Sequence, residues 1–228
     1  MSKTPESKTF KTKQLESEAL DNNTSAERLR ELADYHSKLI RQAVAQNPNT
    51  PPDILLKLFD QFPFQVLSNS ILNLLLIENP LFLEKLYFSS KSIFDKKLPL
   101  FFIEWAMNHP NKTIRADVAY GSQVSQQYLE KLAKDREYIV RLQVAANNNA
   151  SIYLLNQLGE DENHYVRETV AKHPQASLSI LEKLAQDEVA EVRRQVAKNY
   201  NTPNYILKYL ARDNNLHVRA DAIYKIDD

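Results

Sequence analysis

The chain has 228 residues and no net charge, because 29 Lys and Arg balance 29 Asp and Glu. A neutral chain has no general attraction to nucleic acid or to an anionic membrane surface. Cysteine is absent and glycine occurs only at Gly121 and Gly159. These counts exclude disulfides, thiolate metal sites, cysteine nucleophiles and glycine-rich phosphate loops. We therefore expect no cofactor and no metal.

Residues 1–25 are polar and have no apolar period, so we expect a disordered tail. The segment has no apolar core of the kind found in a signal peptide. No apolar stretch of the chain approaches the roughly 20 residues that a membrane span needs. We therefore expect a cytoplasmic protein that makes no membrane contact. The first helix is expected to begin with Ser25 as its cap.

A repeat with a period of 26 residues dominates the chain from residue 114 to the end. An apolar residue followed by Arg marks each copy, and in four of them a Val-Ala pair follows four residues later. The first pairs are Ile114-Arg115, Val140-Arg141, Val166-Arg167, Val192-Arg193 and Val218-Arg219. Apolar groups at i and i+4 share one face of a helix. Ile40-Arg41 marks an earlier copy.

A second helix is predicted between successive Val-Ala helices. It is marked by leucine pairs at Leu129/Leu132, Leu155/Leu158, Leu181/Leu184 and Leu207/Leu210. Helices this short are marginally stable alone, so each must stack on its neighbours. The sequence therefore predicts an all-α solenoid of about 26-residue, two-helix repeats.

The junctions between these helices carry residue types that tolerate a left-handed backbone. They are Asn47, Gly121, Asn147, His173 and Asn199, and we expect them to end helices at positive φ. Thr50 and Thr202 each precede a proline and are expected to cap the following helix. Ser125, Ser151 and Ser177 are the expected caps in other repeats.

The segments VRRQVAKNYNTPNYILKYLARD and IRQAVAQNPNTPPDILLKLFDQ resemble leucine-rich repeat variants, bacterial relatives of HEAT-type solenoids. The resemblance covers residues 26–66 and 106–228 well. It implies a right-handed superhelix in which one helix of each repeat is either a short α-helix or a 3-10 helix. The founding type of that family is associated with a cysteine-bound iron–sulfur module, and this chain has no cysteine, so that role is not carried over.

The middle of the chain breaks the period. We expect residues 26–228 to form a single solenoid domain, with regular repeats at 26–66 and 114–228 and degenerate, aromatic-rich repeats at 67–113. Eight of the nine phenylalanines lie between Phe59 and Phe102. One interpretation is an enlarged core that fills an irregular joint. The other is an exposed apolar patch for a partner, or for self-association with a second copy.

A row of carboxylates accompanies the arginines of the repeat. Asp135, Asp161, Asp187 and Asp213 each lie six residues before Arg141, Arg167, Arg193 and Arg219. We interpret them as a structural ladder in which each carboxylate accepts hydrogen bonds from a loop or from a neighbouring guanidinium. A catalytic set is the alternative, but repeated environments do not separate pKa values as acid–base pairs require. The five histidines show no metal-ligand spacing, so no metal site is predicted.

Variable positions give the candidate binding residues. Tyr120, Lys172 and Lys198 share one repeat phase at the end of the Val-Ala helix, so they should form a row. Tyr153 and Tyr205 form a second aligned pair, and Arg194 adds charge beside Arg193. Tyr and Arg are enriched at the centres of interfaces. Ordinary solvated surface is the alternative interpretation.

The favoured function is a non-enzymatic scaffold that binds an unidentified protein partner along the solenoid surface. A nucleic-acid-binding, HEAT-like protein is the alternative, which the balanced charge disfavours. An accessory or lyase-type factor is a further alternative by architectural analogy alone.

Overall fold

The computed structural model describes residues 5–90 and 92–227, with side chains from Phe10 onward. Within these residues the chain forms 17 α-helices and one 3-10 turn and contains no strand, which confirms the predicted all-α class. The chain divides into two compact units, Met1–Trp105 and Ala106–Asp228. That residues 26–228 form a single solenoid domain stays a prediction.

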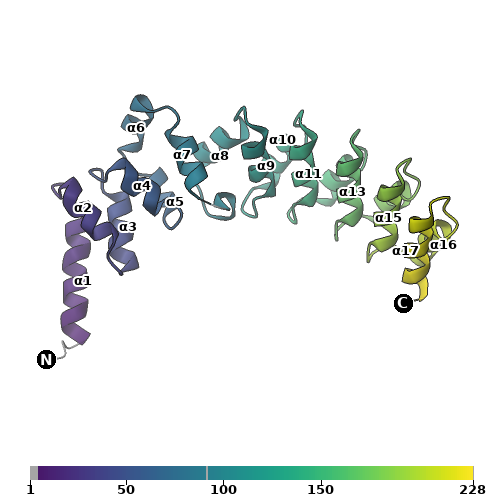
Figure 1. The fold of residues 1–228 in the computed structure, drawn as a ribbon, viewed down its shortest axis with the longest axis horizontal. Coiled ribbons are helices and arrows are strands. Elements are labelled where there is room, and N and C mark those ends of the chain that lie inside the picture. The colour runs from purple at the N-terminus through teal and green to yellow at the C-terminus, as the bar shows by residue number, and fades with distance from the viewer. Residues whose placement is uncertain (1–4, 91, 228) are drawn as a thin grey trace. The chain divides into compact units, whose positions relative to one another are not determined.

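The first unit contains irregularly sized helices. They are α1 (Pro5–Leu20), α2 (Ala26–Ala33), α3 (Lys38–Gln46), α4 (Pro52–Phe59), α5 (Pro63–Leu67), α6 (Leu72–Glu78), α7 (Phe82–Ser89) and the 3-10 turn η1 (Ile93–Asp95). Helix α8 (Leu100–Met107) crosses the boundary between the units. Helices α1, α2 and α4 all contact α3 (Figure 1). The predicted early repeat, marked by Ile40-Arg41, therefore consists of the packed helices α3 and α4.

Helix α1 corrects the expectation of a disordered tail at residues 1–25. Residues 1–4 lie outside the described part, but Pro5–Leu20 is helical and Ala19 is fully buried. The Glu18 carboxylate accepts hydrogen bonds from Arg28 Nε at 2.7 Å and Nη2 at 3.1 Å. The segment is rich in Lys, Glu and Gln, which favour helix without an apolar period. Tertiary contacts at its C-terminal end hold it on α3.

The aromatic residues of the first unit divide between core and surface. Phe59, Phe62, Phe82, Phe94 and Phe102 are buried, whereas Phe64, Phe88 and Phe101 are 42–67% exposed. The Phe59 and Phe102 rings meet edge to face, with centroids 6.0 Å apart. The aromatic middle therefore contains a core and also carries exposed rings; that these rings form a patch for a partner or a second copy stays a prediction.

The second unit is built from two alternating sets of helices. The A helices are α9 (Lys112–Tyr120), α11 (Tyr138–Ala146), α13 (His164–Lys172), α15 (Ala190–Lys198) and α17 (Leu216–Asp227); the B helices are α10 (Gln126–Leu132), α12 (Ile152–Leu158), α14 (Leu178–Leu184) and α16 (Asn204–Leu210). The A helices lie side by side and pack on one another (Figure 1). Each B helix packs mainly on the A helices next to it. All of these helices are α-helical.

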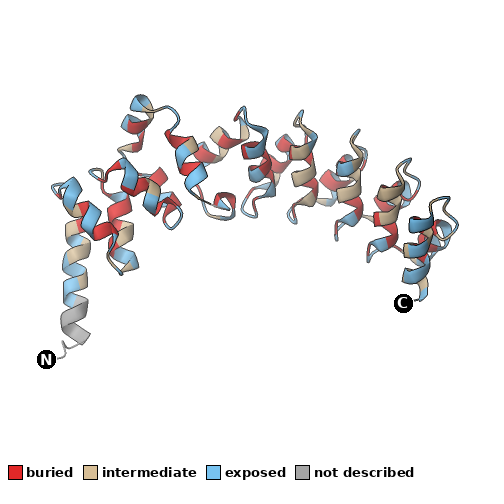
Figure 2. Ribbon diagram, in the orientation of Figure 1, coloured by how far each residue is buried: buried red, intermediate tan, exposed pale blue. Residues whose placement is uncertain are grey.

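The core of the second unit is the repeated apolar set. Val140, Val166 and Val192 are fully buried, and so are the Ala residues that end each Val-Ala pair. The B helices bury their leucines, with Leu155 and Leu181 fully buried. Figure 2 shows buried positions recurring on each helix of this unit. Each layer therefore supplies part of its neighbour's interior.

The predicted left-handed junctions are wrong. Asn47, Gly121, Asn147, His173 and Asn199 have φ between −74° and −59° and an extended ψ. The side chains of Asn47, Asn147, His173 and Asn199, described below, make bonds between repeats instead.

The predicted serine caps hold in part, and the predicted threonine caps do not form. Ser25, Ser151 and Ser177 accept hydrogen bonds from backbone amides of the helices that they cap. Ser125 occupies the cap position without such a bond. The hydroxyls of Thr50 and Thr202 do not cap the next helix, because each donates to a carbonyl of the preceding one.

Candidate functional site

One edge of the second unit is formed by the loops that lead from B helices into A helices. Ion pairs join an arginine of each A helix to an aspartate in the next of these loops. The Nε and Nη2 atoms of each arginine donate to both oxygens of an aspartate 20 residues later, at 2.6–3.0 Å. The pairs are Arg115–Asp135, Arg141–Asp161, Arg167–Asp187 and Arg193–Asp213. We call this the arginine edge. Its bidentate geometry is the strongest that this pair of groups forms.

Each arginine of this edge also holds the loop of its own repeat. Arg141 Nη1 donates to the Asp135 carbonyl at 2.8 Å, six residues before it. Arg219 makes the same contact with the Asp213 carbonyl at 2.6 Å, but no carboxylate among the described residues pairs with it. The ladder residues chosen from the sequence therefore lie together on one edge. Arg115 was missed, although it has the same phase after Ile114 as Arg141 has after Val140.

Two carboxylates of this edge, Asp135 and Asp213, are stabilised in their charged form. Hydrogen bonds from Arg193 lower the pKa of Asp213 below its ordinary value and outweigh the effect of burial. Burial is the largest influence on Asp135 and would raise its pKa, but the bonds from Arg115 and from the Glu137 amide lower it overall. These carboxylates are structural acceptors, since each is already saturated by donors.

The opposite edge of the repeats is joined by buried amide side chains, which the sequence analysis interpreted only as helix ends. Asn147 Nδ2 donates to the carbonyls of Ala119 at 2.7 Å and Gly121 at 3.1 Å in the preceding repeat. Its Oδ1 accepts from the Asn149 amide at 2.8 Å. Asn47, Asn69 and Asn199 make the same pattern of bonds. We call this the asparagine edge.

His173 occupies one position of the asparagine edge. Its Nδ1 accepts from the Gln175 amide at 3.1 Å, so its Nε2 carries the hydrogen toward the Asn147 carbonyl at 3.3 Å. Burial lowers the pKa of His173, although the bond to Asn147 opposes the shift. The neutral ring therefore reproduces the donor and the acceptor of an asparagine.

The predicted surface row lies where the A helices end. Tyr120 is 64% exposed, and Lys172 and Lys198 are exposed at the last residues of α13 and α15. Lys172 pairs with Glu168 at 2.5 Å and Lys198 with Asp221 at 3.4 Å. The two lysine side chains are 51% and 44% exposed, whereas Glu168 and Asp221 are largely covered, at 14% and 26%.

The other candidate binding residues differ in how they are held. Tyr153 on α12 is 74% exposed. Tyr205 is also exposed, and its hydroxyl donates to Glu182 of the preceding B helix. Arg194 is half-buried and donates to Asp221 of α17 at 2.6 Å. Arg194 therefore joins two A helices, whereas Tyr153 faces solvent.

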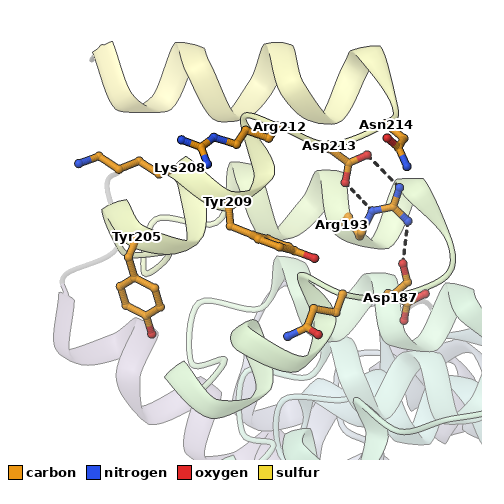
Figure 3. Close-up of a pocket in the computed structure, with 9 residues that line it drawn as sticks. Asp187, Arg193, Tyr205, Lys208, Tyr209, Arg212, Asp213 and Asn214 are labelled. Atoms are coloured by element: carbon orange, nitrogen blue, oxygen red, sulfur yellow. Dashed lines mark hydrogen bonds and ion pairs between the residues drawn. The ribbon is translucent and has the colours of Figure 1, made fainter.

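A groove with a volume of about 730 Å³ lies beside the arginine edge, between α16, the loop that precedes α15 and the loop that precedes α17. We call it the α16 groove. Figure 3 shows the Tyr209 ring extending from α16 toward Arg193, which bonds to both Asp187 and Asp213. Its lining is Gln186, Asp187, Arg193, Tyr205, Lys208, Tyr209, Arg212, Asp213 and Asn214. Apart from Tyr205, the sequence analysis did not select the aromatic and cationic residues of α16 and its C-terminal loop.

The chemistry available at these surfaces is recognition by charge and aromatic contact. Within the described residues, no group of three or more His, Cys, Asp or Glu is arranged to hold a metal ion. Every buried side-chain polar atom in that part of the chain has a hydrogen-bond partner. No helix there is both long and apolar enough to cross a membrane.

The stacked A and B helices, tied along two edges, define a helical repeat protein of the solenoid class. Residues 13–59 match the family model of the Leucine Rich Repeat Variant domain. The resemblance found in the sequence is therefore confirmed, and the matched segment is similar to that domain. The match begins inside α1, within the expected disordered tail.

Solved structures support the same fold. The chain is similar to a protein described as a leucine-rich repeat variant with a novel repetitive structural motif, at 20% identity and a TM-score of 0.53, covering 88% of this chain and 71% of that one. It also aligns with an archaeal HEAT-like repeats protein from Thermococcus onnurineus NA1, at 18% identity and a TM-score of 0.29, covering 94% and 90% of the two chains. The first of these two likenesses supports the solenoid fold. A search of curated proteins gave no match.

Proposed function

We propose that the chain is a non-enzymatic scaffold that binds a protein partner through the surface of its second unit. The observation that carries the proposal is the division of labour among its side chains. The arginine and asparagine edges use their charged and amide groups to join repeats. Exposed tyrosines and lysines recur on the outer positions of the same helices. Repeat proteins use such extended outer surfaces for recognition.

Site-specific crosslinking tests this proposal. A photoreactive phenylalanine analogue placed at Tyr120 or Tyr153 is expected to capture the same partner protein from the source cell. Placed at Gln186, beside the arginine edge, it reports whether the partner also reaches that side. Lys172→Ala is expected to leave the melting temperature unchanged and to weaken capture, because Lys172 is exposed.

Turnover of a small molecule by the purified chain, together with no captured protein at any position, would overturn the proposal. Capture of nucleic acid in place of protein would favour the alternative of a HEAT-like nucleic-acid binder. No observation in the structure favours an accessory or lyase-type factor.

Self-association through the first unit is a second candidate, favoured by helix α6. Its sequence LNLLLIE is apolar around most of the helix, a pattern typical of a buried helix. Yet Leu74 is 57% exposed and Ile77 is 78% exposed. They lie three residues apart, on one face of the helix. The chain has no net charge to repel a second copy.

Light scattering after size exclusion tests this second candidate. A concentration-dependent dimer that Leu74→Glu with Ile77→Lys dissolves would support it, since this pair of changes leaves the net charge unaltered. Leu29→Ala is not a suitable control, because Leu29 is fully buried. A monomer at all concentrations would exclude self-association.

A further inference from the structure

The α16 groove carries positive charge that the rest of the protein does not neutralise. Its two aspartates are already paired, Asp213 with Arg193 and Asp187 with Arg167. Lys208 and Arg212 also line the groove, and neither forms an ion pair with any described residue. Lys208 lies on α16 and Arg212 lies two residues beyond its last residue, Leu210, so both cations are offered to a ligand from the same end of α16.

A second groove one repeat earlier has the opposite character. This α14 groove has a volume of about 580 Å³ and is lined by Gly159, Glu160, Asp161, Arg167, Lys183, Leu184, Gln186, Asp187 and Glu188. Its lysine, Lys183, is paired with Glu160 at 2.6 Å. Glu182 and Gln186 occupy the repeat positions that Lys208 and Arg212 occupy on α16. The same backbone setting thus exists in a cationic and a non-cationic form within one chain.

Tyrosines distinguish the α16 groove as well. Tyr205 and Tyr209 are 53% and 58% exposed, and the corresponding residues on α14 are Ser179 and Lys183. Aromatic rings give a ligand apolar contact area at a low cost in side-chain entropy. Because most of its lining is exposed to solvent, this is a surface groove suited to a chain segment and not an enclosed site for a small molecule.

We propose that the α16 groove binds an acidic peptide segment of a protein partner, with carboxylates on Lys208 and Arg212 and an apolar side chain against Tyr209. This inference rests on the proposed scaffold function and names the chemistry of the partner. A peptide fits better than a nucleic acid, because the carboxylates of Glu182, which bonds to Tyr205, and of Glu188 would meet a phosphate at every nucleotide, whereas a peptide can place uncharged residues beside them. Charge complementarity of this kind steers association and selects the partner.

Fluorescence anisotropy with the full chain tests the inference. The probes are a labelled Glu-Glu-Glu-Phe-Glu-Glu-Glu peptide, the same peptide with Gly in place of Phe, and a single-stranded oligothymidine. The Phe peptide is expected to bind more tightly than the other two. The double variant Lys208→Glu with Arg212→Gln gives α16 the residues of α14, and it is expected to weaken that binding by about tenfold or more.

A charge-matched control separates the groove from general attraction. Lys38→Glu with Lys85→Gln changes the net charge by the same amount at exposed positions of the first unit, and is expected to leave peptide binding unchanged. The reciprocal variant Glu182→Lys with Gln186→Arg is expected to create only a weaker second site for the Phe peptide, because Ser179 and Lys183 stand where α16 has Tyr205 and Tyr209. Circular dichroism checks that each variant is folded. We expect folding to be unaffected, because all of the substituted side chains are exposed.

The outcomes are distinguishable. Equal loss of binding in the groove variant and in the control would show attraction by charge alone and would overturn the inference. Tighter binding of oligothymidine than of the Phe peptide would overturn it in favour of nucleic acid. If no peptide binds while crosslinking at Tyr120 or Tyr153 still captures a protein, the inference about this groove fails and the scaffold function stands.

Discussion

Removing one carboxylate from the arginine edge should destabilise the second unit far more than removing a neighbouring surface carboxylate. Asp187 accepts from Arg167 at 2.6 Å and 3.0 Å and from the Val189 amide at 2.9 Å. Its side chain is only 6% exposed and that of Arg167 only 11%. Asp187→Ala leaves this guanidinium without its main partner, and we expect a loss of about 2–4 kcal/mol of unfolding free energy.

Glu188 provides the control, because it also faces Arg167 but at 3.4 Å and with 85% of its side chain exposed. Glu188→Ala should change stability by less than about 0.5 kcal/mol. Arg167→Met combined with Asp187→Ala removes both charges, so the double variant should be less destabilised than the two single effects added together. The expected coupling is about 1–3 kcal/mol.

Urea unfolding followed by far-ultraviolet circular dichroism measures the free energy of unfolding of five proteins. These are the parent chain, Asp187→Ala, Arg167→Met, the double variant and Glu188→Ala. A coupling energy near zero, or equal losses for Asp187→Ala and Glu188→Ala, would refute the reasoning that buried bidentate pairs hold the repeats together. The pairing across repeats would then be incidental to stability.

Three further changes test other parts of the packing. The lowered pKa of His173 means that the folded chain binds fewer protons there than the unfolded chain, so stability should fall as pH drops below about 6.5. His173→Asn should raise the melting temperature at pH 5 and flatten the dependence of the melting temperature on pH, and identical profiles for the two proteins would contradict this. A Cβ at Gly159 would lie 2.4 Å from Ile180 Cδ1, so Gly159→Ala should cost about 1–3 kcal/mol, and adding Ile180→Val should recover part of it in the same melting assay. Leu184→Ala should cost about 2–5 kcal/mol, because this leucine is 1% exposed, and an unchanged urea midpoint would disprove its place in the core.

The helices of the second unit could be predicted because every repeat buries the same positions. Val140 and Leu155 lie in equivalent environments to their counterparts one repeat on, so the apolar pattern recurs with the fold. The partners on the arginine edge could not be assigned this way. In a strict repeat, each arginine lies at one constant distance along the sequence from the aspartate before it and at another from the aspartate after it. Spacing alone therefore does not tell which of the two carboxylates the arginine binds.

Two other features were missed for different physical reasons. The asparagines at the junctions were interpreted through their backbone preferences, whereas Asn147 is placed there for its side-chain donors and acceptor. Helix α1 has no apolar period. Among its side chains from Phe10 to Leu20, Ala19 is the one that is buried, and Glu18 beside it pairs with Arg28. Polar helices held at one end leave no periodic signal.

The central claim is that each layer of the second unit stabilises the layers beside it. Hydrogen exchange measured by mass spectrometry on the full chain, with and without Leu184→Ala, tests it most directly. We expect faster exchange in α13–α16, a smaller effect at α9, and unchanged exchange in α2–α4 of the first unit. Faster exchange of equal size throughout both units, or confined to α14 alone, would contradict the claim.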